Sequence, residues 1–240
     1  MRYLVEPRNG PWVAVSEGFS RGSAIEDLEN RTRAVQTWFF DLDDNHANSP
    51  AKMIAKQAIG TNHFSPRYAW WCARTAWQLA RKGKAAESET WRDYVNSFLR
   101  SGEALEEARR RFTPESAKQS LYPGVEDFCR LVSGAHRFYV TRNIAEVVEA
   151  YVSALGLNGS FPESADKGRV VEEYVQKNPH VVRFGVDGDS EEDVAMIDVL
   201  QFYHREVLGL YSMDRPNNEM NPKFDVFVSK DRSGLVSLLG

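Results

Sequence analysis

Short apolar runs alternate with longer amphipathic stretches through much of this sequence. The runs at 38–40, 137–140, 181–186, 207–211 and 224–228 end in polar or glycine-rich turns. Runs that are apolar on both faces are typical of strands in a parallel sheet covered by helices. Apolar residues at three- and four-residue spacing predict helices at 125–133, 144–155, 168–177 and 191–203. The alternation predicts an α/β fold, a doubly wound, mostly parallel sheet with a Rossmann-like core.

One long interval breaks this alternation. Residues 47–120 show helical patterns and no convincing strand, which predicts a helical insertion in the α/β domain. The core is then formed by residues 37–46 and 121–240. Residues 1–36 form an N-terminal arm without an assigned role, apart from a possible strand at 12–15.

The charge of the chain is unevenly distributed. Residues 46–120 contain 13 Lys and Arg and 7 Asp and Glu, a net charge of +6, which leaves −10 for the rest of a chain whose total is −4. The basic residues either solvate the helices or attract an anionic substrate.

Composition and hydropathy restrict the class of protein. The 240 residues are 42% hydrophobic and 27% charged, as in soluble globular proteins. No segment approaches the ~18 apolar residues of a membrane span, and the N-terminus lacks the apolar core of a signal peptide. We expect a cytoplasmic protein without a membrane partner. Its net charge makes nucleic acid an improbable partner, and the oligomeric state stays open.

Carboxylates follow two of the predicted strands. Asp41 and Asp43 come directly after the run at 38–40, and Asp189 and Asp193 follow the run at 181–186. In open α/β sheets, ligands bind outside the carboxyl ends of the strands. Asp193 also fits a capping box with the preceding serine, so a structural role stays open for it. Carboxylates at one sheet edge repel each other unless a cation lies among them, and Mg²⁺ prefers such oxygen ligands.

Four separated segments, in this order, resemble the haloacid dehalogenase-like hydrolase superfamily. FFDLDD at 39–44 resembles the first motif, an apolar strand that ends in Asp-x-Asp, and YVTRN at 139–143 resembles the second. Lys167, in SADKGRVVEEYV, resembles the third motif, and GDSEED at 188–193 resembles the fourth. LYPGVEDFCRLV at 121–132 is similar to the Pro-Gly segment that leads into the second motif. The insertion at 47–120 resembles the helical cap that closes over small substrates in this superfamily.

The resemblance implies a phosphatase that uses Mg²⁺. Asp41 would be the nucleophile that forms an aspartyl-phosphate intermediate. Asp43 would protonate the leaving alcohol and then activate water. The metal would be held by the Asp41 side chain, the main-chain carbonyl of Asp43 and Asp189, with support from Asp193.

The same resemblance implies a binding site for the substrate phosphate. Thr141, with Arg142 and Asn143 beside it, would bind phosphoryl oxygens. Lys167 would neutralise the negative charge that develops as Asp41 meets phosphate. The substrate would be a small anionic phosphorylated metabolite.

Two residues depart from the resemblance. Asn45 stands where Thr or Val is usual, and it could change the turn that aims Asp43. Asp187 is an additional acid, either a supporting group or a solvated turn residue.

Two alternatives stay open: a phosphotransferase or mutase of the same superfamily, and a catalytically weak interaction protein that retains the fold. Asn45 is the feature that favours the second alternative. Halide release is disfavoured, because Asp43 supplies an acid that dehalogenation does not need.

Overall fold

A computed structural model describes residues 3–5, 11–19, 23–48, 112–164, 166–213 and 221–240, together with residues 73, 74, 77, 80, 81, 106 and 110. Eight strands form one sheet in the order β1-β2-β8-β7-β6-β3-β4-β5. Their bounds are Tyr3–Val5 (β1), Val13–Val15 (β2), Thr37–Phe40 (β3), His136–Val140 (β4), Gly159–Phe161 (β5), Arg183–Gly188 (β6), Glu206–Met213 (β7) and Val226–Ser229 (β8). The strands from β8 to β5 in this order run parallel, while β1 and β2 pair antiparallel at one edge.

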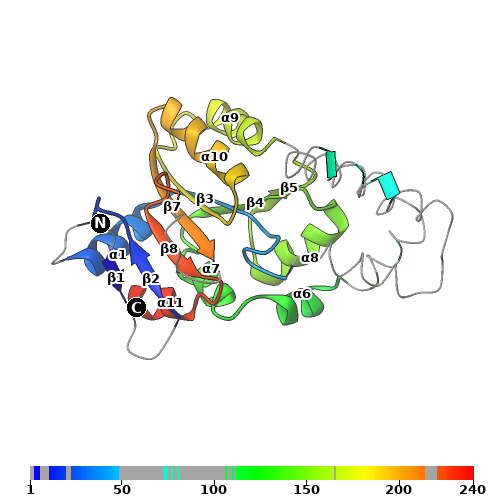
Figure 1. The fold of residues 1–240 in the computed structure, drawn as a ribbon, viewed down its shortest axis with the longest axis horizontal. Helices are drawn as coiled ribbons and strands as arrows, with labels where there is room; N and C mark the ends of the chain where they lie inside the picture. The colour runs from blue at the N-terminus through cyan, green and yellow to red at the C-terminus, as the bar shows by residue number, and fades with distance from the viewer. Residues whose placement is uncertain are drawn as a thin grey trace.

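Helices cover both faces of the sheet (Figure 1). They span Ala24–Ala34 (α1), Pro114–Ser120 (α6), Val125–Leu131 (α7), Ala145–Leu155 (α8), Lys167–Lys177 (α9), Glu191–Phe202 (α10) and Ser233–Leu239 (α11). Trp38 and Phe40 of β3 pack in one hydrophobic cluster with residues of α1, α6, α7, α8 and α11. Phe39 points to the opposite face and packs with residues of α9 and α10. This confirms the predicted doubly wound α/β sheet. Among the described helices, none is both long and apolar enough to cross a membrane.

The described part of residues 1–36, which the sequence left without a role, contributes Val13 to Val15, Phe19 and residues of α1 to this core. Val13 to Val15 are all buried and pair with β8, as the possible strand at 12–15 predicted. The helix α1 was not predicted, because its sequence is mostly polar and it buries only Ala24, Leu28 and Thr32. These residues lie four apart, so they form one narrow stripe on the helix.

The predicted helical insertion at 47–120 lies mostly outside the described residues. Its last part is α6, which begins at a capping box formed by Thr113 and Ser116. Ala117 is fully buried in the same hydrophobic cluster as the sheet residues. By its packing, α6 therefore lies with the core.

The two ends of the insertion meet at one place. Ala47 forms a bridge with Leu121, and the backbone N–H of Tyr122 donates to the carbonyl of His46 at 2.9 Å. The chain therefore leaves and rejoins the core directly after the acidic residues that follow β3.

Close packing between β3 and β6 makes one glycine necessary. Gly185 lies opposite Trp38 in the parallel register, and a Cβ on Gly185 would overlap the indole ring. Trp38 cannot move away easily, since it is fully buried against Phe40 and Phe128, with ring centroids 5.8 and 5.6 Å away.

We expect Gly185→Ala to lower the free energy of unfolding by about 1–3 kcal/mol, because an overpacked core forces side chains off their rotamers. Urea unfolding measures the change. Gly134→Ala is the matched control, since no heavy atom lies within 4 Å of the position its Cβ would take. Equal stability of the two variants would contradict this packing.

Candidate active site

The candidate site lies at the carboxyl ends of three adjacent parallel strands. Asp41 follows β3, Thr141 follows β4, and Asp189 follows β6. Since β3 pairs with both β4 and β6, these three ends lie side by side. Lys167 begins α9, and Asp193 lies in the first turn of α10. The structure thus brings together residues that are up to 152 positions apart in the numbering of the chain.

Lys167 joins two buried carboxylates. Its Nζ lies 2.9 Å from Oδ2 of Asp41 and 2.6 Å from Oδ1 of Asp193, and all three residues are buried. Burial alone lowers the pKa of Lys167, but Asp193 and Asp41 outweigh it and hold this pKa above its ordinary value. Lys167 is therefore a fixed positive charge beside Asp41.

The Asp41 carboxylate lies in a strongly unfavourable environment for a negative charge. Burial raises its pKa well above the ordinary value, Lys167 opposes this, and Asp193, Asp189 and Asp43 raise it further. The site therefore contains more negative charge than Lys167 alone balances.

Asp193 has the capping role that its sequence allowed, and its predicted support of a metal ion stays a prediction. Its Oδ2 accepts from the backbone N–H groups of Asp189 and Ser190, each at 3.0 Å, and from the Ser190 hydroxyl at 2.8 Å. This is the capping box at the start of α10. The other oxygen accepts from Lys167. One carboxylate thus holds the loop after β6 and orients Lys167.

Three carboxylates have the geometry to hold a metal ion. Oxygens of Asp41, Asp189 and Asp193 all lie within 4.8 Å of one another. Burial and then Asp193 raise the pKa of Asp189 to about 7, as expected for crowded carboxylates. A hard divalent cation with oxygen ligands would relieve this repulsion. The residues present therefore fit a divalent cation.

The raised pKa of Asp189 predicts a pH-dependent metal affinity. A cation must displace the proton that Asp189 holds below about pH 7. We expect the affinity for Mg²⁺ to fall at least about tenfold per pH unit as the pH drops below that value, because the raised pKa of Asp41 adds a second proton to displace. Calorimetric titration across this range measures the dependence. An affinity that stays constant from about pH 8 down to pH 6 would contradict the competition.

Asp43 is held by two residues that the sequence predicts as phosphate ligands. Asn143 Nδ2 donates to Asp43 Oδ2 at 2.6 Å, and the Thr141 hydroxyl donates to the same oxygen at 3.3 Å. Thr141 and Asn143 are both fully buried. They orient Asp43 in this structure, and their predicted contact with phosphate stays a prediction.

Arg142 has another partner. It forms an ion pair with Glu192 in the first turn of α10, and both side chains are partly exposed. Its predicted role as a phosphate ligand therefore stays untested by this arrangement.

The loop after Asp43 turns sharply. Asp44 adopts φ of 58° in the left-handed region, which Asp tolerates better than most residues. Its backbone N–H donates to the carbonyl of Ala47 at 2.9 Å, and the N–H groups of His46 and Ala47 both donate to the carbonyl of Leu42. Three backbone hydrogen bonds therefore hold the turn that follows Asp43.

A buried polar network lies beside this loop, and the sequence reasoning did not predict most of it. Asp187 is fully buried, so its reading as a solvated turn residue is wrong. Its Oδ1 accepts from Arg232 Nη2 at 2.6 Å, and its Oδ2 accepts from His46 Nε2 at 3.0 Å. Burial raises the pKa of Asp187, but Arg232 and His46 outweigh it and keep this pKa low.

His46 is an internal member of the network. Burial lowers its pKa, which favours the neutral ring, and the hydrogen bond to Asp187 only partly opposes this. A neutral ring donates from Nε2 to Asp187 and accepts at Nδ1 from the Tyr139 hydroxyl, 3.0 Å away. Arg232 lies three residues after β8, the last strand along the chain, but this position alone does not show which residues it contacts.

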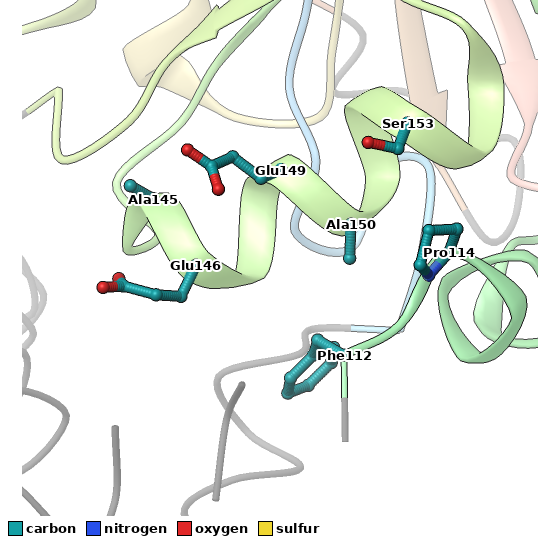
Figure 2. Close-up of a pocket in the computed structure, with 7 residues that line it drawn as sticks. All are labelled: Phe112, Pro114, Ala145, Glu146, Glu149, Ala150 and Ser153. Carbon is teal, nitrogen blue, oxygen red and sulfur yellow. The ribbon is translucent and has the colours of Figure 1, made fainter. Parts of the chain in front are cut away.

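A surface cavity of about 410 Å³, lined by none of these residues, lies between α8 and the start of α6. Figure 2 shows Glu146 and Glu149 on one side of it and Phe112 and Pro114 on the other. Two carboxylates would repel a phosphate ester. The cavity is therefore a poor site for an anionic substrate.

Comparisons with known proteins point to the fold. No family model matches the sequence, and no curated protein matches it. A solved structure described as a phospho-aspartyl intermediate analogue of phosphoserine phosphatase aligns with 85% of this chain and 97% of that chain, at 17% identity and a TM-score of 0.53. The chain has the fold of the haloacid dehalogenase-like hydrolases. This confirms the resemblance found in the sequence at the level of the fold.

Two further structures agree with this fold. A substrate-bound complex of phosphoserine phosphatase aligns with 85% of this chain and 97% of that chain, at 17% identity and a TM-score of 0.53. The structure of DsGPDH of Dunaliella salina aligns with 89% of this chain at 15% identity and a TM-score of 0.65. This chain spans only 37% of the length of that protein.

Proposed function

We propose that this protein is a Mg²⁺-dependent phosphomonoester hydrolase that acts through an aspartyl-phosphate intermediate on Asp41. The observation that carries the proposal is the surroundings of Asp41. It is a buried carboxylate at a strand end, bonded to Lys167 and grouped with Asp189 and Asp193. Asp43, two residues further on, is held by its own hydrogen bonds.

Mg²⁺ would be held by Asp41, Asp189 and the main-chain carbonyl of Asp43, with Asp193 in support, and it would supply charge that draws phosphate and carboxylate together. Lys167 supplies a second positive charge at Asp41 Oδ2. Both charges would stabilise the negative charge that develops on the phosphoryl oxygens.

Asp41 and Asp43 divide the chemistry between them. A carboxylate oxygen of Asp41 bonds to phosphorus, the bond from phosphorus to the alcohol oxygen breaks, and the alcohol takes a proton from Asp43. Water then attacks phosphorus and returns a proton to Asp43, and the bond to Asp41 breaks as phosphate leaves. Asn143 and Thr141 keep Asp43 in place for both transfers.

The surroundings of Asn45 argue against a catalytically weak protein. Its side chain donates to the main-chain oxygens of Asp41 and Asp187, so it braces the site rather than disrupting it. The fixed position of Asp43 likewise favours phosphate esters over halides, since a halide needs no proton to leave.

The substrate is proposed to be a small metabolite with negative charge beyond its phosphate. The net charge of +6 on residues 46–120 supports this. The ends of that segment meet at Ala47 and Leu121, directly after the acidic loop. A helical cap inserted between Ala47 and α6 would therefore start beside the site and return to it through α6.

Phosphate release tests the proposal. The assay compares an aryl phosphate and a panel of phosphorylated metabolites, with Mg²⁺ and with chelator. We expect the protein to release phosphate only when Mg²⁺ is present, and all of it as free phosphate. Transfer of phosphate to a second hydroxyl group would indicate a phosphotransferase or mutase, and no release from any compound by folded, Mg²⁺-bound protein would contradict the proposal.

A further inference from the structure

One side chain ties together the two strand ends that carry the candidate catalytic groups. Asn45 Nδ2 donates to the carbonyl oxygen of Asp41 at 3.2 Å and to that of Asp187 at 2.9 Å. Asp41 directly follows β3, and Asp187 lies in β6, two residues before Asp189. Asn45 therefore constrains the distance between Asp41, the proposed nucleophile, and Asp189, a proposed metal ligand.

Arg232 fixes the orientation of that side chain. Its Nη2 donates to Asn45 Oδ1 at 2.8 Å and to Asp187 Oδ1 at 2.6 Å, and its Nη1 donates to the carbonyl of Ser229 at 3.1 Å. Ser212 also donates to Asn45 Oδ1. Because the guanidinium of Arg232 can only donate, the amide oxygen of Asn45 faces it and the amide nitrogen faces the strand ends.

The network is closed to solvent. Asn45, Asp187 and Arg232 are fully buried, and Ser212 nearly so. Hydrogen bonds inside a protein are stronger than in water, so this network restrains its members even though the Nε of Arg232 has no partner among the described residues. The two strand ends therefore have one well-defined separation.

We infer that Asn45, held by Arg232 and Asp187, is the positioning residue that sets the distance between Asp41 and Asp189. The inference rests on the proposed function for its effect on rate, but its effect on metal binding stands apart from it. Residues that orient metal ligands typically change metal affinity or activity by about 10–100-fold when they are replaced.

If this network only stabilised the fold, its loss would lower the stability of the chain and leave the Mg²⁺ affinity and kcat unchanged. Buried charge pairs contribute little to stability on balance, and breaking one destabilises the chain without touching a remote site. The test therefore needs variants that separate stability from metal affinity and rate.

Asn45→Leu keeps the size of the side chain and removes all its hydrogen bonds. We expect the Kd for Mg²⁺, measured by calorimetry, to rise at least about tenfold and kcat to fall about 10–100-fold, with KM for the aryl phosphate nearly unchanged. Asn178→Leu is the control, because Asn178 also donates from Nδ2 to a backbone oxygen, that of Tyr174 at 2.9 Å. The control is expected to change only the melting temperature.

Arg232→Lys gives a second, milder test, which covers a failure of Asn45→Leu to fold. The lysine keeps the positive charge beside Asp187 but cannot bond Asn45, Asp187 and Ser229 together. Arg137→Lys is its control, since Arg137 is also buried and bonds the backbone oxygens of Cys129 and Gly156 at 2.8 and 2.6 Å. We expect weaker Mg²⁺ binding and slower turnover in Arg232→Lys only.

The outcomes separate the inference from the proposed function. If the wild type binds Mg²⁺ but releases no phosphate, and the site variants still bind Mg²⁺ more weakly, the positioning role holds and the proposed function fails. If the site variants match the wild type in Mg²⁺ affinity and kcat, or change no more than the controls, the positioning role is wrong.

Discussion

Asp41→Asn is expected to fold normally and to lose phosphatase activity by about 10⁴-fold or more, because an amide oxygen is a poor nucleophile toward phosphorus. Asp41 lies at the end of β3 with Lys167 bonded to its Oδ2. Neither Asp189 nor Asp193 can take its place without leaving its own position after β6 or in α10.

The stability of Asp41→Asn separates a chemical loss from a folding defect. Burial and the neighbouring carboxylates raise the pKa of Asp41, so the charged form is unfavourable in the metal-free site. Removing that charge is expected to leave the free energy of unfolding unchanged or higher. The control is Asp198→Asn on the surface, where Asp198 pairs with Lys223. Retention of more than about a tenth of the activity would contradict a nucleophilic role.

Lys167→Met is expected to have the largest effect on stability in the absence of metal. It leaves the buried Asp41 and Asp193 without the ammonium group that bonds both. Removing one partner of a buried ion pair lowers the free energy of unfolding by about 3–5 kcal/mol. The rate should fall about 10³-fold as well, because a fixed positive charge is lost from the site.

Added Mg²⁺ should partly restore the stability of Lys167→Met. A divalent cation among Asp41, Asp189 and Asp193 supplies the missing positive charge. We expect thermal melting of the variant to shift upward with Mg²⁺ by more than that of the wild type. Lys118→Met serves as control, since Lys118 pairs with Glu126 on the surface. Equal melting temperatures of wild type and Lys167→Met without metal would contradict the role of Lys167.

The candidate site could be predicted in outline because it depends on local patterns and one rule of topology. The apolar run before Asp41 and the one before Asp189 each predict a strand, and parallel neighbours end at the same sheet edge. Their meeting in the structure follows from the pairing of β3 with β6. The capping box at Asp193 could also be read from four consecutive residues.

The supporting network could not be predicted, because its contacts are set by tertiary structure. Arg232 reaches Asn45 across 187 positions of the chain. Asp187 was left open between two roles, since a sequence alone does not show which strand-end carboxylates are buried. The edge strand β5 was missed for a similar reason, because Gly159–Phe161 has no apolar alternation and depends on pairing with β4.

The most direct test of the central claim is the mass of the peptide that contains Asp41 after an acid quench during turnover of an aryl phosphate. Asp43→Asn is the variant to use, because it slows the attack of water on the intermediate, while an aryl leaving group needs little protonation. The account predicts one phosphoryl group on Asp41 in this variant and none in Asp41→Asn. Release of phosphate with no phosphoryl group on Asp41, or with one on another residue, would contradict it.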